Sequence, residues 1–228
     1  MKHVNITYLL GTALLSATLM VTSCGKTTKG KIDNEWKVTN YEETTVWIDK
    51  TMTQTEVIKL DQSDVAITYI QSASGQPTIT STNQGKVLQH AFTIRKDGTW
   101  SLIREYYTEH TSQDTLRRFT RYYSASGSWN FLEKGKEDGY GKRERILFQT
   151  LQEKTSNVLT FMMEGQPDIV PTSDVTNKTY EPGDFSTIYV VENSSKKNLS
   201  LTSESIVKTD NSFSGASAIE KSVKLNLE

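Results

Sequence analysis

Apolar and polar side chains alternate along most of the chain beyond about residue 32. The last segment shows the pattern most clearly, because the apolar residues of its strand fall on one face: Ile219, Val223, Leu225 and Leu227. Side chains of a strand point alternately to opposite faces, so a two-residue period predicts strands with one buried face. No segment stands out as helical, and the pattern predicts an all-β chain.

The pattern predicts roughly ten or eleven strands joined by short polar turns. They are counted from twelve apolar runs, not each of which need be a separate strand: 36–38, 46–48, 65–70, 92–95, 100–103, 116–123, 127–131, 146–148, 158–162, 188–191, 199–201 and 219–227. Asp97-Gly98 between two runs is a strong hairpin signal, because a type I′ turn needs positive φ angles. Successive strands without intervening helices favour an antiparallel meander, and closing it into a β-barrel removes its exposed edges.

Two segments fit strands poorly. Residues 50–60 have weak helical character, and residues 165–184 hold three prolines among Ser, Thr and Asp. A connection as long as 165–184 is expected to be either a functional lid or a flexible loop. We see no internal repeat.

The N-terminal segment has the features of an export signal. A basic start at Lys2 precedes an uncharged apolar stretch over 6–21, which is short for a membrane span. Val21-Thr22-Ser23-Cys24 resembles the lipobox of bacterial lipoproteins. The resemblance implies cleavage before Cys24 and acylation of that residue. The alternative is a signal anchor with an incidental cysteine.

We therefore expect three parts: a signal peptide over 1–23, a lipidated flexible tether over 24–31, and one β-barrel domain over 32–228. Several acyl chains would anchor the protein stably in a membrane. No acidic residue follows Cys24 directly, which favours an outer-membrane lipoprotein facing the periplasm, with surface exposure as the alternative.

Composition narrows the possible partners and chemistry. The 26 basic and 27 acidic residues leave a net charge of −1, which does not favour nucleic acid as a partner. Cys24 is the one cysteine, so no intramolecular disulfide can form. Beyond the signal the histidines are His90 and His110, with no zinc spacing and no nucleophile elbow. The sequence predicts no metal, no cofactor and no catalytic residue.

Aromatic and basic residues gather on successive predicted strands and suggest a ligand cavity. An aromatic cavity with an arginine can hold an amphipathic or carboxylated small molecule. The candidate lining residues are Trp100, Arg104, Tyr106, Arg118, Tyr122 and Trp129. The alternative is a filled barrel core with outward-facing tyrosines.

Three short motifs carry a family resemblance: Trp36-Lys37-Val38-Thr39-Asn40-Tyr41, Asp97-Gly98-Thr99-Trp100 and Gly127-Ser128-Trp129-Asn130-Phe131. With the strand at 197–201, they resemble lipocalin-like lipoproteins of Bacteroidetes. The resemblance implies a lipocalin-like barrel. It departs from true lipocalins at Asn34, where those proteins have glycine.

Asp114-Thr115-Leu116 resembles the O-glycosylation motif of the same bacteria and makes Thr115 a candidate site. Together these features predict a non-catalytic, membrane-anchored binding or scaffold lipoprotein, which could hold a small amphipathic ligand in its barrel. The alternatives are an envelope assembly component that contacts another protein and, more weakly, a hydrolase.

Overall fold

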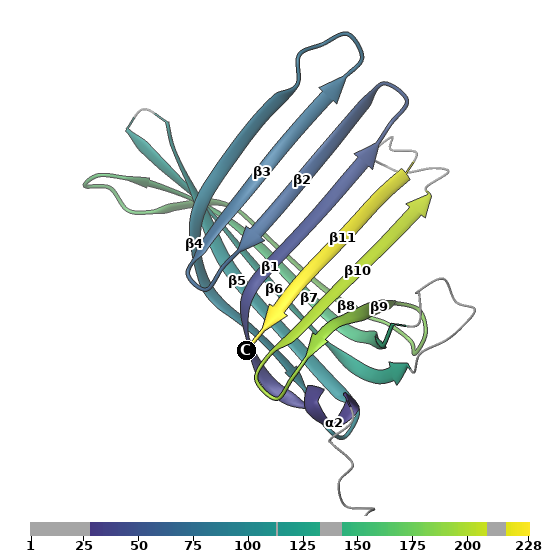
Figure 1. Cartoon of the computed structure of the whole chain (residues 1–228). Coiled ribbons are helices and arrows are strands. Elements are labelled where there is room, and N and C mark those ends of the chain that lie inside the picture. The colour runs from purple at the N-terminus through teal and green to yellow at the C-terminus, as the bar shows by residue number, and fades with distance from the viewer. Residues whose placement is uncertain (1–27, 113, 133–142, 209–217) are drawn as a thin grey trace, which may run out of the picture.

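The structure, a computed structural model, describes residues 28–112, 114–132, 143–208 and 218–228 (Figure 1). The expected signal peptide over 1–23, Cys24 and the Gly-rich segment 133–142 lie outside the described residues. The described part is almost entirely strand. Its elements are α2 (Lys29–Ile32), β1 (Asn34–Ile48), β2 (Met52–Leu60), β3 (Asp64–Ala73), β4 (Ile79–Ile94), β5 (Thr99–Ser112), β6 (Thr115–Leu132), β7 (Arg145–Met163), β8 (Ile169–Thr179), β9 (Ser186–Ser194), β10 (Leu199–Lys208) and β11 (Ala218–Leu227).

The strands of the described chain form one antiparallel sheet in the order β6-β5-β4-β3-β2-β1-β11-β10-β9-β7-β8. An additional pairing joins β6, the first strand of this order, to β7, the second strand from its other end, and closes the sheet into a ring that leaves β8 outside. In Figure 1, β1, β10 and β11 form the near wall and β5, β6 and β7 the far wall. The predicted all-β antiparallel meander that curls shut is therefore confirmed.

The two ends of the ring differ in construction. At the end near α2, β1 pairs directly with β4 through Asn34 to Lys37, so β2 and β3 are excluded from the ring there. β9 pairs with β7 on the other side. Eight of the described strands, β1, β4, β5, β6, β7, β9, β10 and β11, make this closed end.

At the opposite end the sheet separates into two arms. One arm holds β10, β11 and β1–β4, and the other holds β5–β8. The pairing of β4 with β5 begins at Gln84 and Glu109, so the strand ends beyond these residues diverge. Gly85 lies at this fork, where an added Cβ would come within 1.8 Å of the Tyr107 carbonyl oxygen. On the other side β8 pairs only with β7 among the described strands. We call the end of the barrel where the two arms separate the open end.

The apolar core fills the closed end. Trp36, Ile94, Ile146, Leu201 and Leu227 are each at most 1% exposed. Phe92, Trp100 and Phe148 meet edge to face, with ring centroids 5.2–5.9 Å apart. Each buried indole also donates a hydrogen bond to a backbone carbonyl, from Trp36 to Ile32, Trp100 to Gln149 and Trp129 to Arg95. Buried N–H groups are thus satisfied and the core is fixed in one arrangement.

Helix α2 and the last strand both meet the start of β1. Ile32 is fully buried under the core, so residues 29–31 of the expected tether belong to a helical turn against the barrel. The backbone N–H of Lys37 donates to the carbonyl of Glu228 at 2.9 Å, and the N–H of Glu228 donates to Lys37 at 3.0 Å. The beginning and the end of the domain therefore share one seam.

Four segments differ from the expectation. Residues 50–60, predicted weakly helical, form β2, and the expected loop over 165–184 contains β8. In β8 the side chains of 172–179 are all exposed, so burial gave no apolar pattern to find. The runs 116–123 and 127–131, predicted as two strands, are one continuous strand, β6. The runs 146–148 and 158–162, also predicted as two strands, both lie in the single strand β7.

The turns also refine the prediction. The Asp97-Gly98 hairpin is confirmed, but it has a three-residue loop in which Gly98 has φ +85° rather than a two-residue type I′ turn. The turns β3–β4 and β7–β8 share the pattern Gly-Gln-Pro-x-Ile, at 75–79 with Thr78 and at 165–169 with Asp168, and each glycine has a positive φ. The sequence interpretation missed this repeat, which gives the tips of the two arms the same turn.

Candidate functional site

Polar side chains line the interior directly beyond the apolar core. Strand parity places them inside, because they alternate with outward-facing neighbours and follow core residues on the same face. The residues of this polar layer are Tyr41, Glu43, His90, Arg104, Tyr123, Glu153 and Tyr189. The described interior is therefore apolar at the closed end and ionised farther toward the open end.

Arg104 on β5 is the centre of this layer. Its guanidinium carbon lies 4.5 Å from the ring centroid of Tyr41 and 5.3 Å from that of Tyr123, one ring from each wall. Its Nη1 lies 3.8 Å from an Oε2 of Glu43, and both side chains are about nine-tenths buried (11% and 12% exposed). Burial alone would lower the pKa of Arg104, but Tyr41 and Glu43 raise it. Arg104 is permanently cationic.

Glu43 on β1 links three groups. It accepts a hydrogen bond from the Tyr41 hydroxyl, and its Oε1 lies 3.0 Å from Nζ of Lys221 on β11. Burial would raise the pKa of Glu43, but Arg104 and Lys221 outweigh it and lower the pKa. Glu43 is thus an ionised counter-ion held by two cations, not a proton donor near neutral pH.

His90 on β4 is neutral in this layer. Its ring meets Tyr41 edge to face, with centroids 5.4 Å apart. Neither ring nitrogen has a hydrogen-bond partner among the described residues. Burial, and then the charge of Arg104, lower the pKa of His90 to about 3. A protonated imidazole here would be both desolvated and repelled.

A second cluster, around Arg121 on β6, lies closer to the open end. Arg121 Nη2 donates to the Tyr69 hydroxyl at 3.0 Å, and Nη1 lies 3.6 Å from Oε2 of Glu56 on β2. Burial alone would lower the pKa of Arg121, but the phenols and Glu56 around it raise it. This cluster ties β6 of one arm to β2 and β3 of the other across the interior.

A cavity of about 430 Å³ lies beside this second cluster, on the arm that holds β1–β4. Tyr69 belongs to both. The other lining residues are Trp47, Asp49, Met52, Gln54, Thr55, Ile70, Gln71, Ile79 and Ser81. Apolar and amide side chains thus lie together in a space large enough for a small molecule.

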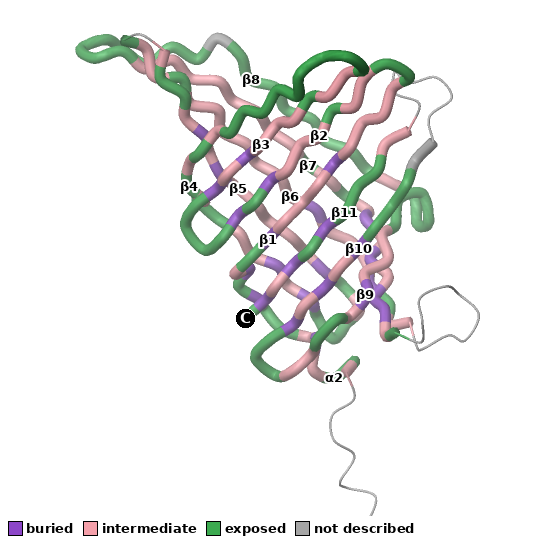
Figure 2. Tube along the Cα trace, turned by 45° about the horizontal axis from the view of Figure 1, so that its top comes forward, coloured by how far each residue is buried: buried purple, intermediate pink, exposed green. Residues whose placement is uncertain are grey.

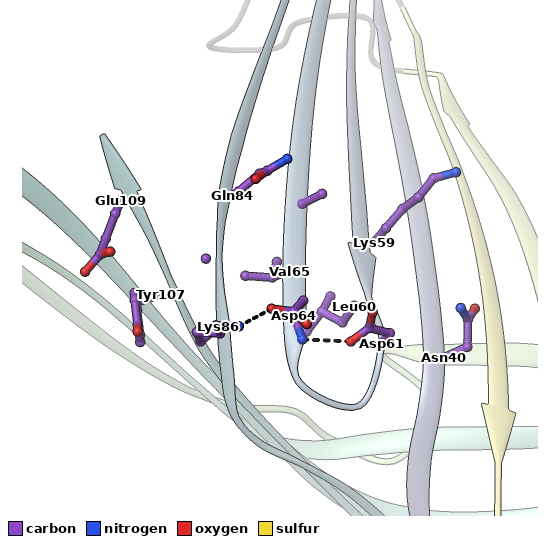
Figure 3. Close-up of a pocket in the computed structure, with 12 residues that line it drawn as sticks. Asn40, Lys59, Leu60, Asp61, Asp64, Val65, Gln84, Lys86, Tyr107 and Glu109 are labelled. Carbon is purple, nitrogen blue, oxygen red and sulfur yellow. Dashed lines mark hydrogen bonds and ion pairs between the residues drawn. The ribbon is translucent and has the colours of Figure 1, made fainter. Parts of the chain in front are cut away.

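A larger groove of about 650 Å³ lies on the outer surface, where β1–β5 diverge (Figure 3). Its basic residues are in ion pairs, Lys86 with Asp64 and Lys59 with Glu42. Asp61 holds the backbone N–H of Asp64, and Glu109 pairs with Arg118. Lys86 and Asp64 are more than half exposed. Such solvated pairs contribute little binding energy, so the interior is the better candidate.

The structure separates the six predicted ligand residues. Trp100, Arg104, Tyr106 and Trp129 face the interior, but both tryptophans are buried in the core, and Tyr106 is 3% exposed. Arg118 and Tyr122 face outward instead: Arg118 pairs with Glu109 at 2.7 Å, and Lys154 lies over the Tyr122 ring. The predicted glycosylation residue, Thr115, is the first residue of β6 and pairs with Met163.

Sequence reasoning missed Arg121 and Tyr123, the inward-facing residues on either side of Tyr122. It also missed Glu43, Tyr69 and Trp47. The sequence did contain a signal for Arg121 and Tyr123, namely their position along the strand. On one continuous strand, Arg121 and Tyr123 share the parity of Trp129, which the sequence analysis already placed inside. Splitting β6 into two predicted strands concealed that parity.

The described residues contain no group of three or more His, Cys, Asp or Glu placed to hold a metal ion. Among their helices, none combines the length and the apolar character needed to cross a bilayer. The sequence matches no protein-family model and no curated protein. What the site can do is therefore argued from its geometry.

Proposed function

We propose that the chain is a non-catalytic binding lipoprotein, anchored to the cell envelope through Cys24, which holds a small amphipathic ligand in the cavity at its open end. The observation that carries this proposal is the composition of that cavity. Trp47, Met52 and Ile79 supply apolar surface, and Gln54, Tyr69 and Gln71 supply hydrogen-bonding groups. Few, well-placed polar groups in an apolar pocket are typical of small-molecule sites.

The orientation of the ligand follows from the second cluster. The Tyr69 hydroxyl accepts its hydrogen bond from Arg121, so the cavity adjoins a cation on the side of the barrel interior, whereas Asp49, between β1 and β2, places a carboxylate in its lining. Ile79, which is 64% exposed, lies at the arm tip. We therefore place the polar group of the ligand near Tyr69 and its apolar part toward Ile79.

Tryptophan fluorescence tests this proposal directly. Trp47 lines the cavity, whereas Trp36, Trp100 and Trp129 are at most 6% exposed in the core. Titration with oleate, cholate and maltoheptaose should give a saturable change with an amphipathic probe and none with the sugar. Trp47→Phe should remove that change. A flat response to all three probes, or an unchanged response in Trp47→Phe, would refute binding in this cavity.

The anchor needs its own test. Globomycin, which blocks lipoprotein signal cleavage, should leave the precursor uncleaved, and Cys24→Ala should release the protein from membranes. Unchanged processing and unchanged membrane association in both experiments would refute lipidation. The two tests are independent, since the cavity lies within the described β-domain and Cys24 lies before it.

A further inference from the structure

The outer edge of β8 carries unpaired backbone groups. The N–H of Tyr180 donates to the Leu151 carbonyl of β7 at 2.9 Å, and Thr155 lies opposite Thr176. In an antiparallel strand, alternate residues direct both backbone groups to the same side. The even-numbered residues of β8 therefore bond to β7. The odd-numbered ones, from Ser173 to Thr179, point their N–H and C=O groups away from it.

Such an edge is a template for another strand. Figure 2 shows β8 exposed along the rim of the open end. A partner strand bonded to Ser173, Val175, Asn177 and Thr179 would extend the sheet without moving any described strand.

The side chains of β8 are complementary to a second copy of themselves. If two β8 strands run antiparallel with Thr176 opposite Thr176, then Asp174 of each faces Lys178 of the other. These would be pairs without backbone hydrogen bonds, the type in which side chains lie closest. Opposite charges at such positions stabilise a pair of strands. Lys178, whose side chain is 54% exposed, lies 3.9 Å from Oε1 of Glu153, and its ammonium group has three donors, enough for a second carboxylate.

Two further features fit the same register. Pro171, which has no N–H to donate, lies outside the bonded span of 173–179. Moving the two-fold axis to Val175 would bring Pro171 into the ladder, opposite Thr179, and remove a hydrogen bond. With the axis at Thr176, Val175, which is 56% exposed, lies diagonally across from its own copy and gains apolar contact.

We propose that two copies of this chain associate through the free edges of β8, antiparallel about a two-fold axis at Thr176. The ladder uses eight backbone hydrogen bonds and two Asp174–Lys178 pairs, so that β7 and β8 of both copies form one continuous sheet. The association is isologous, and it closes after two copies because each copy has this edge once in its described strands.

Cysteine cross-linking of the full chain in membranes tests the register. Non-hydrogen-bonded partners have Cα atoms about 4.5 Å apart, within the range of a disulfide. Thr176→Cys should therefore give a disulfide-linked dimer on a non-reducing gel. Thr172→Cys, on the same face but opposite Tyr180 of the other copy, should give at least fivefold less. The parental chain controls for Cys24. Equal cross-linking at both positions, no dimer at Thr176→Cys, or a cross-link to a different protein there, would overturn the proposal.

Charge reversal tests the pairing in the same assay. Asp174→Lys places lysine opposite lysine and should reduce the Thr176→Cys dimer several-fold. Adding Lys178→Asp restores opposite charges across the interface and should restore the dimer. An Asp174→Lys chain that cross-links like its parent, or a double variant that stays as low as the single one, would argue against pairing of these residues. Unchanged protease resistance of the variants shows that the barrel itself is intact.

Discussion

The closed and open ends of the barrel share most of their strands but hold together differently. At the closed end a ring of eight strands surrounds an apolar core with three buried tryptophans. At the open end the strands part into two arms, and arginine clusters bridge the interior. Burial of apolar area is the larger source of stability, whereas ion pairs fix geometry at little net gain. The closed end therefore supplies most of the free energy that stabilises the fold, and the open end supplies less.

The largest effect should come from removing a core indole. Trp36→Ala deletes a side chain that is 1% exposed together with its hydrogen bond to Ile32, so we expect a loss of about 3–5 kcal/mol in the free energy of unfolding. Trp47→Ala, at the cavity, should cost about 1 kcal/mol. Urea denaturation of both variants measures the difference. Equal losses would contradict the division between the two ends.

The next largest effect on stability should come from substitutions in the polar layer. Arg104→Met leaves Glu43 buried without its arginine, and we expect a loss of about 3 kcal/mol. Arg104→Met with Glu43→Gln should recover at least about 1 kcal/mol of it, because the buried charge is gone. Arg121→Met, in the more exposed cluster, should cost about 1 kcal/mol. A double variant no more stable than Arg104→Met would show that the pair is not coupled.

Acid should weaken the polar layer through His90. The unfolded chain protonates this histidine near pH 6.5, but in the folded protein its pKa is about 3. Between these values unfolding takes up a proton, so the free energy of unfolding falls as the pH decreases, by up to about 1.4 kcal/mol per unit. His90→Phe should flatten the stability profile between pH 6.5 and 4. The exposed His110→Gln serves as the control and should retain the parental slope.

The smallest effect should appear at the arm tips. Ile79→Ser and Ile169→Ser replace side chains that are 64% and 49% exposed, and each should change stability by less than about 0.5 kcal/mol. Ile79→Ser should nevertheless weaken binding of an amphipathic probe, because Ile79 lines the cavity. Ile169 occupies the same position in the turn of the other arm but does not line the cavity, so Ile169→Ser is the control. Equal binding by both variants would remove Ile79 from the site.

Local patterns determined much of this fold in advance. Alternation identified the last strand, β11, and Asp97-Gly98 identified the β4–β5 hairpin, since both signals act over a few residues. Strand β8 was missed because its apolar residues do not alternate: Ile169 and Val170 are adjacent, and beyond Pro171 the strand is polar on both faces except at Val175. Its place in the sheet depends on backbone pairing with β7, which side-chain type does not encode.

The interior was harder to predict for a geometric reason. Adjacent residues of the same kind, such as Tyr122 and Tyr123, face opposite ways, and only the register decides which one is inside. The pairing is also irregular between Val38 and Asn40 on β1 and between Val87 and Gln89 on β4. Each irregularity changes whether odd-numbered or even-numbered residues of the strand face the interior. The two arginine clusters also join strands far apart in sequence, which no local spacing reveals.

The seam between Lys37 and Glu228 has a kinetic consequence. Its two strands are about 190 residues apart, so the contact order is high and closing the ring carries a large loop entropy. Strand β1 cannot pair with β11 until β11 has been synthesised. Until then the backbone groups along that edge of β1 are unpaired and can template aggregation. A chain stopped before β11 should therefore form inclusion bodies rather than a smaller barrel, and refolding should be slow, on the millisecond-to-second scale typical of non-local β topologies.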